Sequence, residues 1–498
     1  MWAELRDTPH RAYDPQILAL PLPALRSNNG DIGGQGYGSW RASLVGSGAV
    51  HYPTRSYQTG AAGLLFAWMT LVMPEPTTSP RLSQRAKWAG GQPISELMAQ
   101  ALAHPELISL AAGFVDQATL PVEPTQAAME ALFSEPRAAR AALQYGTTPG
   151  YRPLREAILA RMVEADRALP NEAGLSTDQL VVTAGSNQLL HLVGETLLDP
   201  GDIVLCAAPT YFVFLGMLAN QGARSIGVAA DEQGMIPEAL EEQLERLDRA
   251  GELERVKAIY CVSYFDNPSS VSLAAARRPQ IVELAKRWSR TQRIYVIDDA
   301  AYRELRYEGE DLPSLRAYDE RGDTVIVAGT FSKSYSPGVR VGWGLLPREL
   351  VGPVCEQKGN IDFGSPNLAQ HLMSKVLQLG LYDSHVAQLR RSYAEKMGAM
   401  LEAAEQYLGP LEGVDWLRPS GGLYVWLTLP EAMDAGSAGP LFARAMEAGV
   451  LYVPGHYSFP AEGPQQKNTI RLSFGVQPAK NIRRGVKGLA EAIAGLVG

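Results

Sequence analysis

Short apolar runs that alternate with amphipathic stretches constrain the fold of this chain more than any other feature. The runs span residues 179–182, 203–206, 258–262, 294–297, 325–327 and 341–346. Such uninterrupted runs are typical of strands that are buried on both faces, as in a mainly parallel sheet. Between two of them, Ile281, Leu284, Ala285 and Trp288 fall on one face of a helix expected over residues 277–290. The sequence therefore predicts an α/β fold.

A smaller α+β unit is expected after residue 366. Long helical stretches come first, followed by strands over residues 421–427 and 469–474 and a last helix from about Asn481. We expect four parts: an irregular or disordered N-terminal extension at 1–72, an N-terminal arm with part of the small domain at 73–137, a large domain at 138–365, and a small C-terminal domain at 366–498.

Residues 1–72 have no sustained helical or alternating pattern. Five arginines, no lysine and four acidic residues give this segment a net charge of only +1. Its glycine cluster at 33–38 follows no strand and precedes no amphipathic helix, so we interpret it as a flexible tract rather than a nucleotide loop. We expect the segment to be a disordered extension or the product of an upstream start choice.

Composition excludes several classes of function. The formal net charge of −8 argues against a nucleic-acid partner bound by a global basic field. Cys206, Cys261 and Cys355 lie far apart without metal-type or disulfide-type spacing, which fits a reducing cytoplasm. The longest apolar run, 61–73, is shorter than the roughly 20 residues that span a bilayer. We expect a cytoplasmic protein with small-molecule ligands, no membrane segment and no metal.

Polar residues follow the apolar runs, at the end of a parallel sheet where ligands bind. Ser186 lies in a Gly-Ser turn that opens an apolar helix, which suits a phosphate, although a simple serine N-cap is the alternative. Asn267 and the pair Asp298 and Asp299 follow two further runs. A carboxylate at a buried strand end needs a cation or a strong donor, so we expect a partner for at least one of the pair.

Lys333 emerges from another apolar run among small hydroxyl residues, with Arg340 shortly after it. A lysine in such surroundings can have a lowered pKa and act as a Schiff-base nucleophile, whereas the alternative is a lysine that reaches the surface. A phosphate turn, a carboxylate, a nucleophilic lysine and a second phosphate cation are what pyridoxal phosphate requires. In order, Ser186, Asp299, Lys333 and Arg340 supply these four groups, and Asn267 follows another strand end between the first two.

The chain from Ser83 to Gly498 resembles a class I/II aminotransferase, a member of the fold-type I pyridoxal-phosphate enzymes. Residues 144–155 resemble the family's Tyr-Gly segment, in which the tyrosine, here Tyr145, reaches the cofactor phosphate of the partner subunit. The resemblance thus implies a homodimer with shared sites. Residues 185–188 resemble the phosphate turn with Ser186 and Asn187, and Tyr211 matches the residue that stacks on the pyridine ring.

Further residues take roles that the resemblance implies. Asn267 matches the asparagine that contacts the cofactor's phenolic oxygen and also binds the substrate in the family. In this chain Ser269-Ser270 replaces the family's Thr-Gly. Asp299 with Tyr302 matches an Asp-x-x-Tyr pattern in which the aspartate keeps the pyridine nitrogen protonated. The remaining assignments are Thr330 and Arg340 to the phosphate, Arg471 to the substrate carboxylate, and Gly113 to the substrate pocket.

The resemblance implies transamination. Lys333 would hold the cofactor as an internal aldimine and then, once displaced by the substrate amine, move the proton from the substrate Cα as base and acid. The products are a 2-oxo acid and, after transfer to an acceptor such as 2-oxoglutarate, a new amino acid. A pyridoxal-phosphate lyase or decarboxylase uses the same motifs and stays an alternative. A transcription regulator with an aminotransferase-like domain is disfavoured, because residues 1–72 show neither a basic face nor a recognition helix.

The choice of substrate depends on Ser95. Relatives that hold acidic or kynurenine-like side chains have an arginine at this place, after the isoleucine of the 93–97 stretch. The serine disfavours an aminoadipate-type substrate and leaves aromatic or branched-chain amino acids open.

Overall fold

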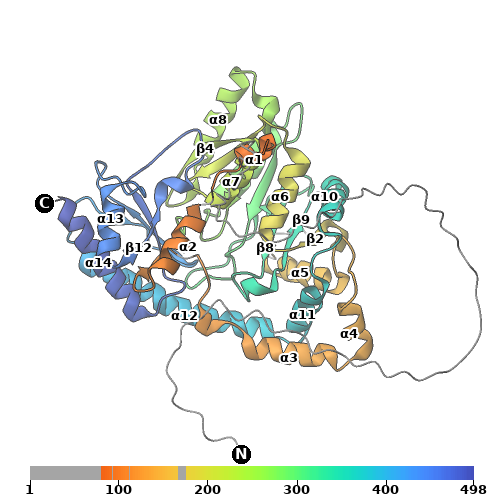
Figure 1. Cartoon of the computed structure of the whole chain (residues 1–498). Coiled ribbons are helices and arrows are strands. Elements are labelled where there is room, and N and C mark those ends of the chain that lie inside the picture. Colours follow the sequence, from red (N-terminus) through yellow and green to blue (C-terminus); the bar gives the residue numbers. More distant parts are fainter. Residues whose placement is uncertain (1–79, 92, 112, 167–174, 498) are drawn as a thin grey trace, which may run out of the picture. The chain divides into compact units, whose positions relative to one another are not determined.

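An eight-stranded sheet lies at the centre of the part of the chain that the structure describes (Figure 1). The structure, a computed structural model, describes residues 80–497 apart from 92, 112 and 167–174. The prediction for residues 1–72 therefore lies outside the described residues. The strands follow the order β2 (Leu180–Thr183), β9 (Gly342–Leu345), β8 (Val325–Thr330), β7 (Tyr295–Asp299), β6 (Val256–Val262), β3 (Ile203–Ala208), β4 (Arg224–Asp231) and β5 (Gly234–Met235).

The sheet is mainly parallel, as predicted. Strands β8, β7, β6, β3 and β4 run parallel, whereas β9 is antiparallel to both of its neighbours and β5 is antiparallel to β4. Strand β9 reverses because residues 331–341 are too few to form a helical crossover back to the starting edge. Strand β2 then pairs with β9, so it points the same way as the parallel strands and ends at the same edge.

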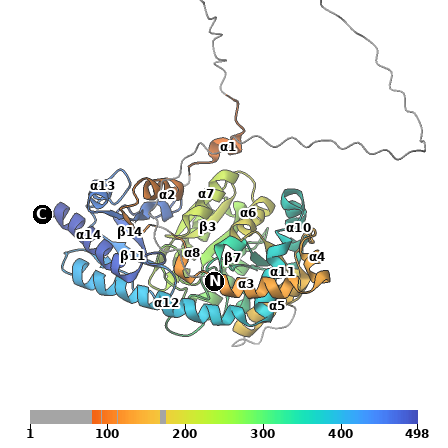
Figure 2. The same ribbon diagram turned by 60° about the horizontal axis from the view of Figure 1, so that its bottom comes forward.

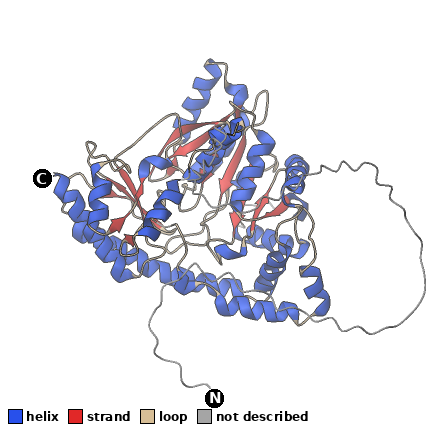
Figure 3. Ribbon diagram, viewed as in Figure 1, coloured by secondary structure: helices blue, strands red, loops and turns tan. Residues whose placement is uncertain are grey.

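Helices cover both faces of this sheet, which explains why its strands have no polar face. Along β3, Leu205 packs into the core that contains Ile281 of α9, and the next residue, Cys206, packs into the core that contains Leu189 of α6. Figure 3 shows the strands enclosed by helices. The helices around the sheet are α5 (Arg152–Ala165), α6 (Ser186–Leu197), α7 (Phe212–Gln221), α8 (Pro237–Arg249), α9 (Arg277–Trp288), α10 (Arg348–Asp362) and α11 (Asn367–Gln378).

Most predicted strands lie within two or three residues of their observed positions, but within the large sheet β4 and β5 were missed. Strand β4 begins with Arg224, ends with Asp231 and carries Gly227 near its middle, so its sequence contains no long apolar run. Its position near the edge of the sheet permits these residues, because only its centre is buried between helices. The last helix, α14 (Ala479–Val497), starts two residues before the predicted Asn481.

A four-stranded antiparallel sheet forms from the C-terminal part of the chain. Its order is β10 (Asp415–Trp416), β11 (Tyr424–Thr428), β14 (Thr469–Ser473) and β13 (Val453–Pro454), with helix α13 (Pro440–Glu447) in the same region. A two-stranded parallel pair of β1 (Ile108–Ser109) and β12 (Val450–Leu451) attaches the N-terminal segment to it. The remaining N-terminal helices are α1 (Gln84–Trp88), α2 (Pro93–Ala103), α3 (Val122–Phe133) and α4 (Pro136–Ala142). The domain boundaries at 137/138 and 365/366 stay predictions.

Helix α12 (Leu381–Ala403) contributes to both hydrophobic cores. Tyr382 belongs to one core and Tyr393 to the other, and Figures 1 and 2 show the helix running from α14 toward α3. Lys396 of α12 donates a 2.6 Å hydrogen bond to Asp116, and both side chains are about nine-tenths buried. This ion pair fixes the segment that carries Gly113. No described helix combines the length and the apolar character that a membrane span requires.

Replacing Lys396 with methionine should lower the free energy of unfolding by about 3 kcal/mol, because the Asp116 carboxylate then stays buried without its cation. The matched control is Lys487→Met, since Lys487 and Glu491 form a pair whose side chains are 56% and 65% exposed. The control should change stability by less than about 0.5 kcal/mol. Urea unfolding followed by circular dichroism measures both. Equal effects of the two substitutions would contradict a structural role for the buried pair.

Candidate active site

A cavity of about 420 Å³ lies at the edge of the large sheet where the parallel strands end. Asp299 is the last residue of β7, Thr330 is the last residue of β8, and Asn267 follows β6. Eleven of the twelve predicted site residues line this cavity, and the exception is Tyr145. The eleven are Gly113, Ser186, Asn187, Tyr211, Asn267, Asp299, Tyr302, Thr330, Lys333, Arg340 and Arg471.

One end of the cavity is built from backbone that approaches closely around the start of α6. Gly185 is the N-cap of α6 with φ of +85°, and a Cβ there would lie 2.6 Å from Arg340 Nη2. A Cβ on Gly342 would lie 2.4 Å from the carbonyl carbon of Gly185. The N-cap is thus Gly185 and not Ser186, which is the first helical residue. The free N–H groups at this helix end favour an anion.

Hydroxyl groups and Arg340 surround the same helix end. Arg340 donates a 2.9 Å hydrogen bond from Nη2 to the Ala184 carbonyl oxygen. Thr330 Oγ1 lies 2.9 Å from Ser332 Oγ and accepts a 3.1 Å hydrogen bond from the Ser332 N–H. Sequence reasoning gave Ser332 no role, although it lies one residue before Lys333. These groups together match the donors that a phosphate group requires.

Asp299 is a buried carboxylate in the middle of the cavity. It accepts hydrogen bonds from the Tyr260 hydroxyl at 2.8 Å and from the Ala301 N–H at 3.2 Å. Burial raises the pKa of Asp299 to about 6, and these two donors oppose the rise. Its neighbour Asp298 accepts hydrogen bonds from Ser263 and from the Leu315 N–H instead. The prediction of partners for this pair is confirmed, and Asp298 has a structural role away from the cavity.

Lys333 extends into the cavity and donates a 2.8 Å hydrogen bond to the Gly113 carbonyl oxygen. Burial lowers the pKa of Lys333, and the positive charges of Arg471 and Arg340 lower it further, while Tyr424 acts in the opposite direction. A lysine with a lowered pKa has a larger share of neutral amine near pH 7. The side chain is therefore suited to nucleophilic and base chemistry.

Arg471 also lines the cavity, and its residue is only 2% exposed. It donates from Nη1 to Asn267 Oδ1 at 2.8 Å and from Nη2 to the Ala111 carbonyl oxygen at 2.7 Å. Its Nε is buried and has no hydrogen-bond partner among the residues that the structure describes. A buried guanidinium with an unsatisfied N–H favours a planar anion such as a carboxylate.

Aromatic side chains form the walls. The Tyr211 hydroxyl lies 3.4 Å from Asn187 Oδ1, and the Tyr302 hydroxyl lies 3.0 Å from the hydroxyl of Tyr424. Sequence reasoning placed Tyr424 in a strand but assigned it no function. The strand register indicates that Tyr424 lies near Arg471. Arg471 pairs with Trp426, and period-two alternation puts Tyr424 on the same face of β11 as Trp426.

Tyr145 is the one predicted residue that the single chain does not bring into the cavity. Its side chain is 81% exposed, and its ring packs edge-on against Phe363 with centroids 5.8 Å apart. Its assignment to a phosphate in a partner subunit stays a prediction.

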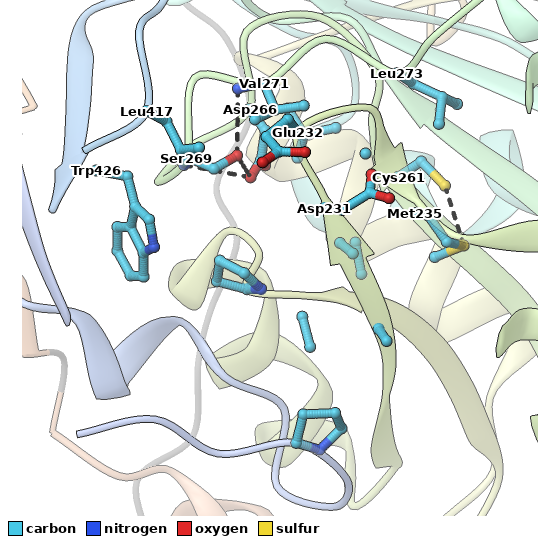
Figure 4. A pocket seen from close by; sticks show the side chains of 18 of the residues that line it. Asp231, Glu232, Met235, Cys261, Asp266, Ser269, Val271, Leu273, Leu417 and Trp426 are labelled. Carbon is cyan, nitrogen blue, oxygen red and sulfur yellow. Dashed lines mark hydrogen bonds between the residues drawn. The ribbon is translucent and has the colours of Figure 1, made fainter. Parts of the chain in front are cut away.

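A second cavity of about 310 Å³ lies beside the first, and Val262 lines both (Figure 4). Within it, Asp266 accepts a 2.8 Å hydrogen bond from Ser269 Oγ, and burial raises the pKa of Asp266 to about 7. Ser270 has φ of +57°, so it adopts the left-handed conformation although it replaces the family's glycine. Burial raises the pKa of the Cys261 thiol, so this cavity contains no activated thiolate.

The described residues contain no group of three His, Cys, Asp or Glu that could hold a metal.

Comparison with known proteins identifies the class to which this fold and site belong. The family model of class I and II aminotransferases matches residues 105–489, and the chain belongs to this family. It is therefore an enzyme, an aminotransferase of the fold-type I group.

Individual relatives cover most of the chain. It is 35% identical to aromatic-amino-acid aminotransferase 1 of Thermococcus litoralis, over 78% of this chain and 88% of that one. It is 34% identical to 2-aminoadipate transaminase of Thermus thermophilus, over 79% and 91%. The crystal structure of Pyrococcus horikoshii kynurenine aminotransferase in complex with PMP matches with a TM-score of 0.76 and 33% identity, over 84% of this chain and 98% of that one.

The lowered pKa of Lys333 predicts that its amine reacts at lower pH than an ordinary lysine. We expect reductive methylation of the cofactor-free protein, followed by peptide mass spectrometry, to label Lys333 at a lower pH in the folded protein than in the same protein unfolded in urea. A lowered pKa means that the proton leaves at lower pH, so the neutral amine is available earlier in the titration. Labelling of Lys333 at a higher pH in the folded protein than in the unfolded protein would show that its charged form is stabilised instead.

Proposed function

We propose that this aminotransferase binds pyridoxal 5′-phosphate through Lys333 and transfers the amino group of an aromatic amino acid to a 2-oxo acid, with 2-oxoglutarate as the acceptor. One observation carries the proposal. The cavity is lined by three cationic side chains, Lys333, Arg340 and Arg471, and none of them lies within ion-pair distance of an acidic side chain among the described residues. Such a cavity requires anionic ligands.

The residues present fit the cofactor. The start of α6 at Ser186, together with Thr330 and Arg340, would hold its phosphate, and Asp299 would face its ring nitrogen. Tyr211 would stack on the ring, while Asn267 and Tyr302 would donate to its phenolic oxygen. Bound there, the cofactor supplies an electron-withdrawing ring that makes the substrate Cα–H acidic. The close approach of Gly185 to Arg340, where a Cβ would fill the space, supports the phosphate assignment.

Lys333 and Arg471 divide the remaining tasks. Because its pKa is lowered, Lys333 has the neutral amine that a base needs, and the same group can return the proton as an acid. Arg471 has a buried Nε–H with no hydrogen-bond partner among the described residues, and its guanidinium would donate to the substrate carboxylate and fix the direction of the Cα–H bond. Lys333 would act on the Cα–H bond, whereas Arg471 would bind the carboxylate. Together the two residues would orient the substrate Cα in the cavity.

The walls of the cavity support an aromatic amino acid as the substrate. Phe114, Phe212 and Val213 line it, and Ser95 stands where an arginine would serve an acidic side chain. Beyond the three named cations, the described lining contains no lysine or arginine. An aromatic amino acid suits this apolar wall, and the name of the Thermococcus litoralis relative agrees with this choice.

Turnover of an amino-acid panel tests the function. We expect aromatic amino acids to give their 2-oxo acids only when 2-oxoglutarate is present in catalytic excess, with at least about tenfold preference in kcat/KM over 2-aminoadipate. Lys333→Ala should lose both turnover and the visible absorbance of the bound cofactor. Release of ammonia without an acceptor would indicate a lyase, release of carbon dioxide would indicate a decarboxylase, and retained turnover in Lys333→Ala would exclude the assignment of this lysine.

We also propose a homodimer whose active sites are shared. Tyr145 and Phe363 form an exposed apolar patch with Leu143 and Ile361, whose side chains are 65% and 54% exposed. The segments are held together, since Asn367 Nδ2 donates to the Gln144 carbonyl oxygen at 2.9 Å. A rigid apolar surface of this kind marks an interface. A second copy of this chain is the partner, because Tyr145 then acquires the phosphate contact that the resemblance implies.

Mixed dimers test the shared site. Tyr145→Phe and Lys333→Ala should each be nearly inactive as homodimers, because each lacks one half of every site. Refolded together, they should regain about a quarter of the wild-type activity, since half of the dimers are mixed and each mixed dimer has one complete site. Light scattering measures the mass of the assembly. Mixtures that show no more activity than the sum of the separate variants would contradict sharing, and a monomer would exclude the dimer.

A further inference from the structure

We propose that Tyr424 is a positioning residue that connects the carboxylate-binding Arg471 to Tyr302 at the cofactor end of the cavity. The proposal rests on the proposed function and deepens it. Tyr424 lies on β11, its side chain is 1% exposed, and its residue lines the cavity. Its ring contacts Arg471, and its hydroxyl contacts Tyr302.

The ring of Tyr424 contacts Arg471. The Arg471 guanidinium carbon lies 4.3 Å from the centroid of the Tyr424 ring, within the range of a cation–π interaction. In its own plane, the guanidinium is already fixed by hydrogen bonds to Asn267 and to the Ala111 carbonyl oxygen. The remaining freedom is a tilt out of that plane, and the ring restricts this motion. The ring therefore holds the unpaired Nε in a defined direction.

The hydroxyl of Tyr424 contacts Tyr302. Their oxygens lie 3.0 Å apart, and their rings meet edge-on with centroids 5.9 Å apart. Burial is the main cause that raises the pKa of Tyr302 well above its usual range, and the neighbouring Tyr424 raises it further. The phenol of Tyr302 therefore keeps its proton. Two phenols that share one hydrogen bond have one proton left over. With Tyr424 as donor, the proton of Tyr302 points away from Tyr424 and is available to the phenolic oxygen of the cofactor.

Gly113 occupies the space beside this hydroxyl. A Cβ on Gly113 would lie 3.1 Å from the Tyr424 hydroxyl oxygen and 3.9 Å from Arg471 Nη2. The carbonyl oxygen of Gly113 accepts the hydrogen bond of Lys333. A side chain at Gly113 would thus push against Tyr424 and disturb the lysine at the same time. This contact gives the predicted pocket residue Gly113 a physical reason to be glycine.

Two substitutions separate the two contacts. Tyr424→Phe keeps the ring and removes the hydroxyl, whereas Tyr424→Leu removes both. The probes are the dissociation constant of 3-phenylpropionate, a carboxylate without an amino group, measured by calorimetry on the holoenzyme, and the pH titration of the cofactor absorbance. Tyr452→Phe is the control, because Tyr452 is a fully buried tyrosine whose hydroxyl donates to the Ala435 carbonyl oxygen and which does not line the cavity.

Tyr424→Phe should shift the midpoint of the absorbance titration and leave the dissociation constant of 3-phenylpropionate within about twofold, whereas Tyr424→Leu should also weaken this binding by about tenfold. Gly113→Ala should weaken binding, and Tyr424→Phe added to it should restore part of the loss, because the clashing oxygen is gone. The Gly113 pair tests the contact even if Tyr424→Leu fails to fold.

Unchanged titration in Tyr424→Phe together with no rescue of Gly113→Ala would overturn the proposal, as would equal shifts in Tyr452→Phe. These outcomes differ from failure of the proposed function, in which the wild-type protein itself would bind no cofactor and show no absorbance to titrate.

Discussion

Three cationic side chains line one cavity and have no acidic partner within the part of the chain that the structure describes, and the rest of the structure holds them there. Lys333, Arg340 and Arg471 repel one another, and each is held by a backbone carbonyl oxygen, of Gly113, Ala184 and Ala111 respectively. Carbonyl dipoles orient a cation without cancelling its charge, so the cavity keeps a positive potential for an anionic ligand. Holding these carbonyls requires both the large sheet and the N-terminal segment that β1 and the Lys396–Asp116 pair attach to the C-terminal part of the chain.

Burial adjusts the acid and base groups of the site in opposite directions. It lowers the pKa of Lys333 and raises the pKa of Asp299 to about 6. Lys333 therefore supplies neutral amine nearer to pH 7, while Asp299 stays mostly ionised above its pKa and can face a protonated ring nitrogen. One physical cause, removal from water, thus shifts both groups, and the hydrogen bond from Tyr260 opposes the rise in the pKa of Asp299.

The sequence predicts the site better than it predicts the outline of the sheet. Asn267, Asp299 and Thr330 could be placed together because parallel strands end at one edge and buried strands are uninterrupted apolar runs. Strand β4 was missed because its charged ends and its glycine hide a strand near the edge. Tyr424 was missed because its role depends on the register between β11 and β14, which neither strand reveals by itself. The role predicted for Tyr145 requires a second chain and stays a prediction.

Borohydride reduction of the purified protein followed by peptide mapping tests the central claim most directly. Reduction fixes the cofactor to the amine that carries it, so mass spectrometry identifies the residue without a measurement of activity. The account predicts a phosphopyridoxyl group on Lys333 alone, lost when a substrate amino acid is added before reduction. A modified lysine elsewhere, or no modified peptide from protein that was saturated with pyridoxal phosphate, would contradict it.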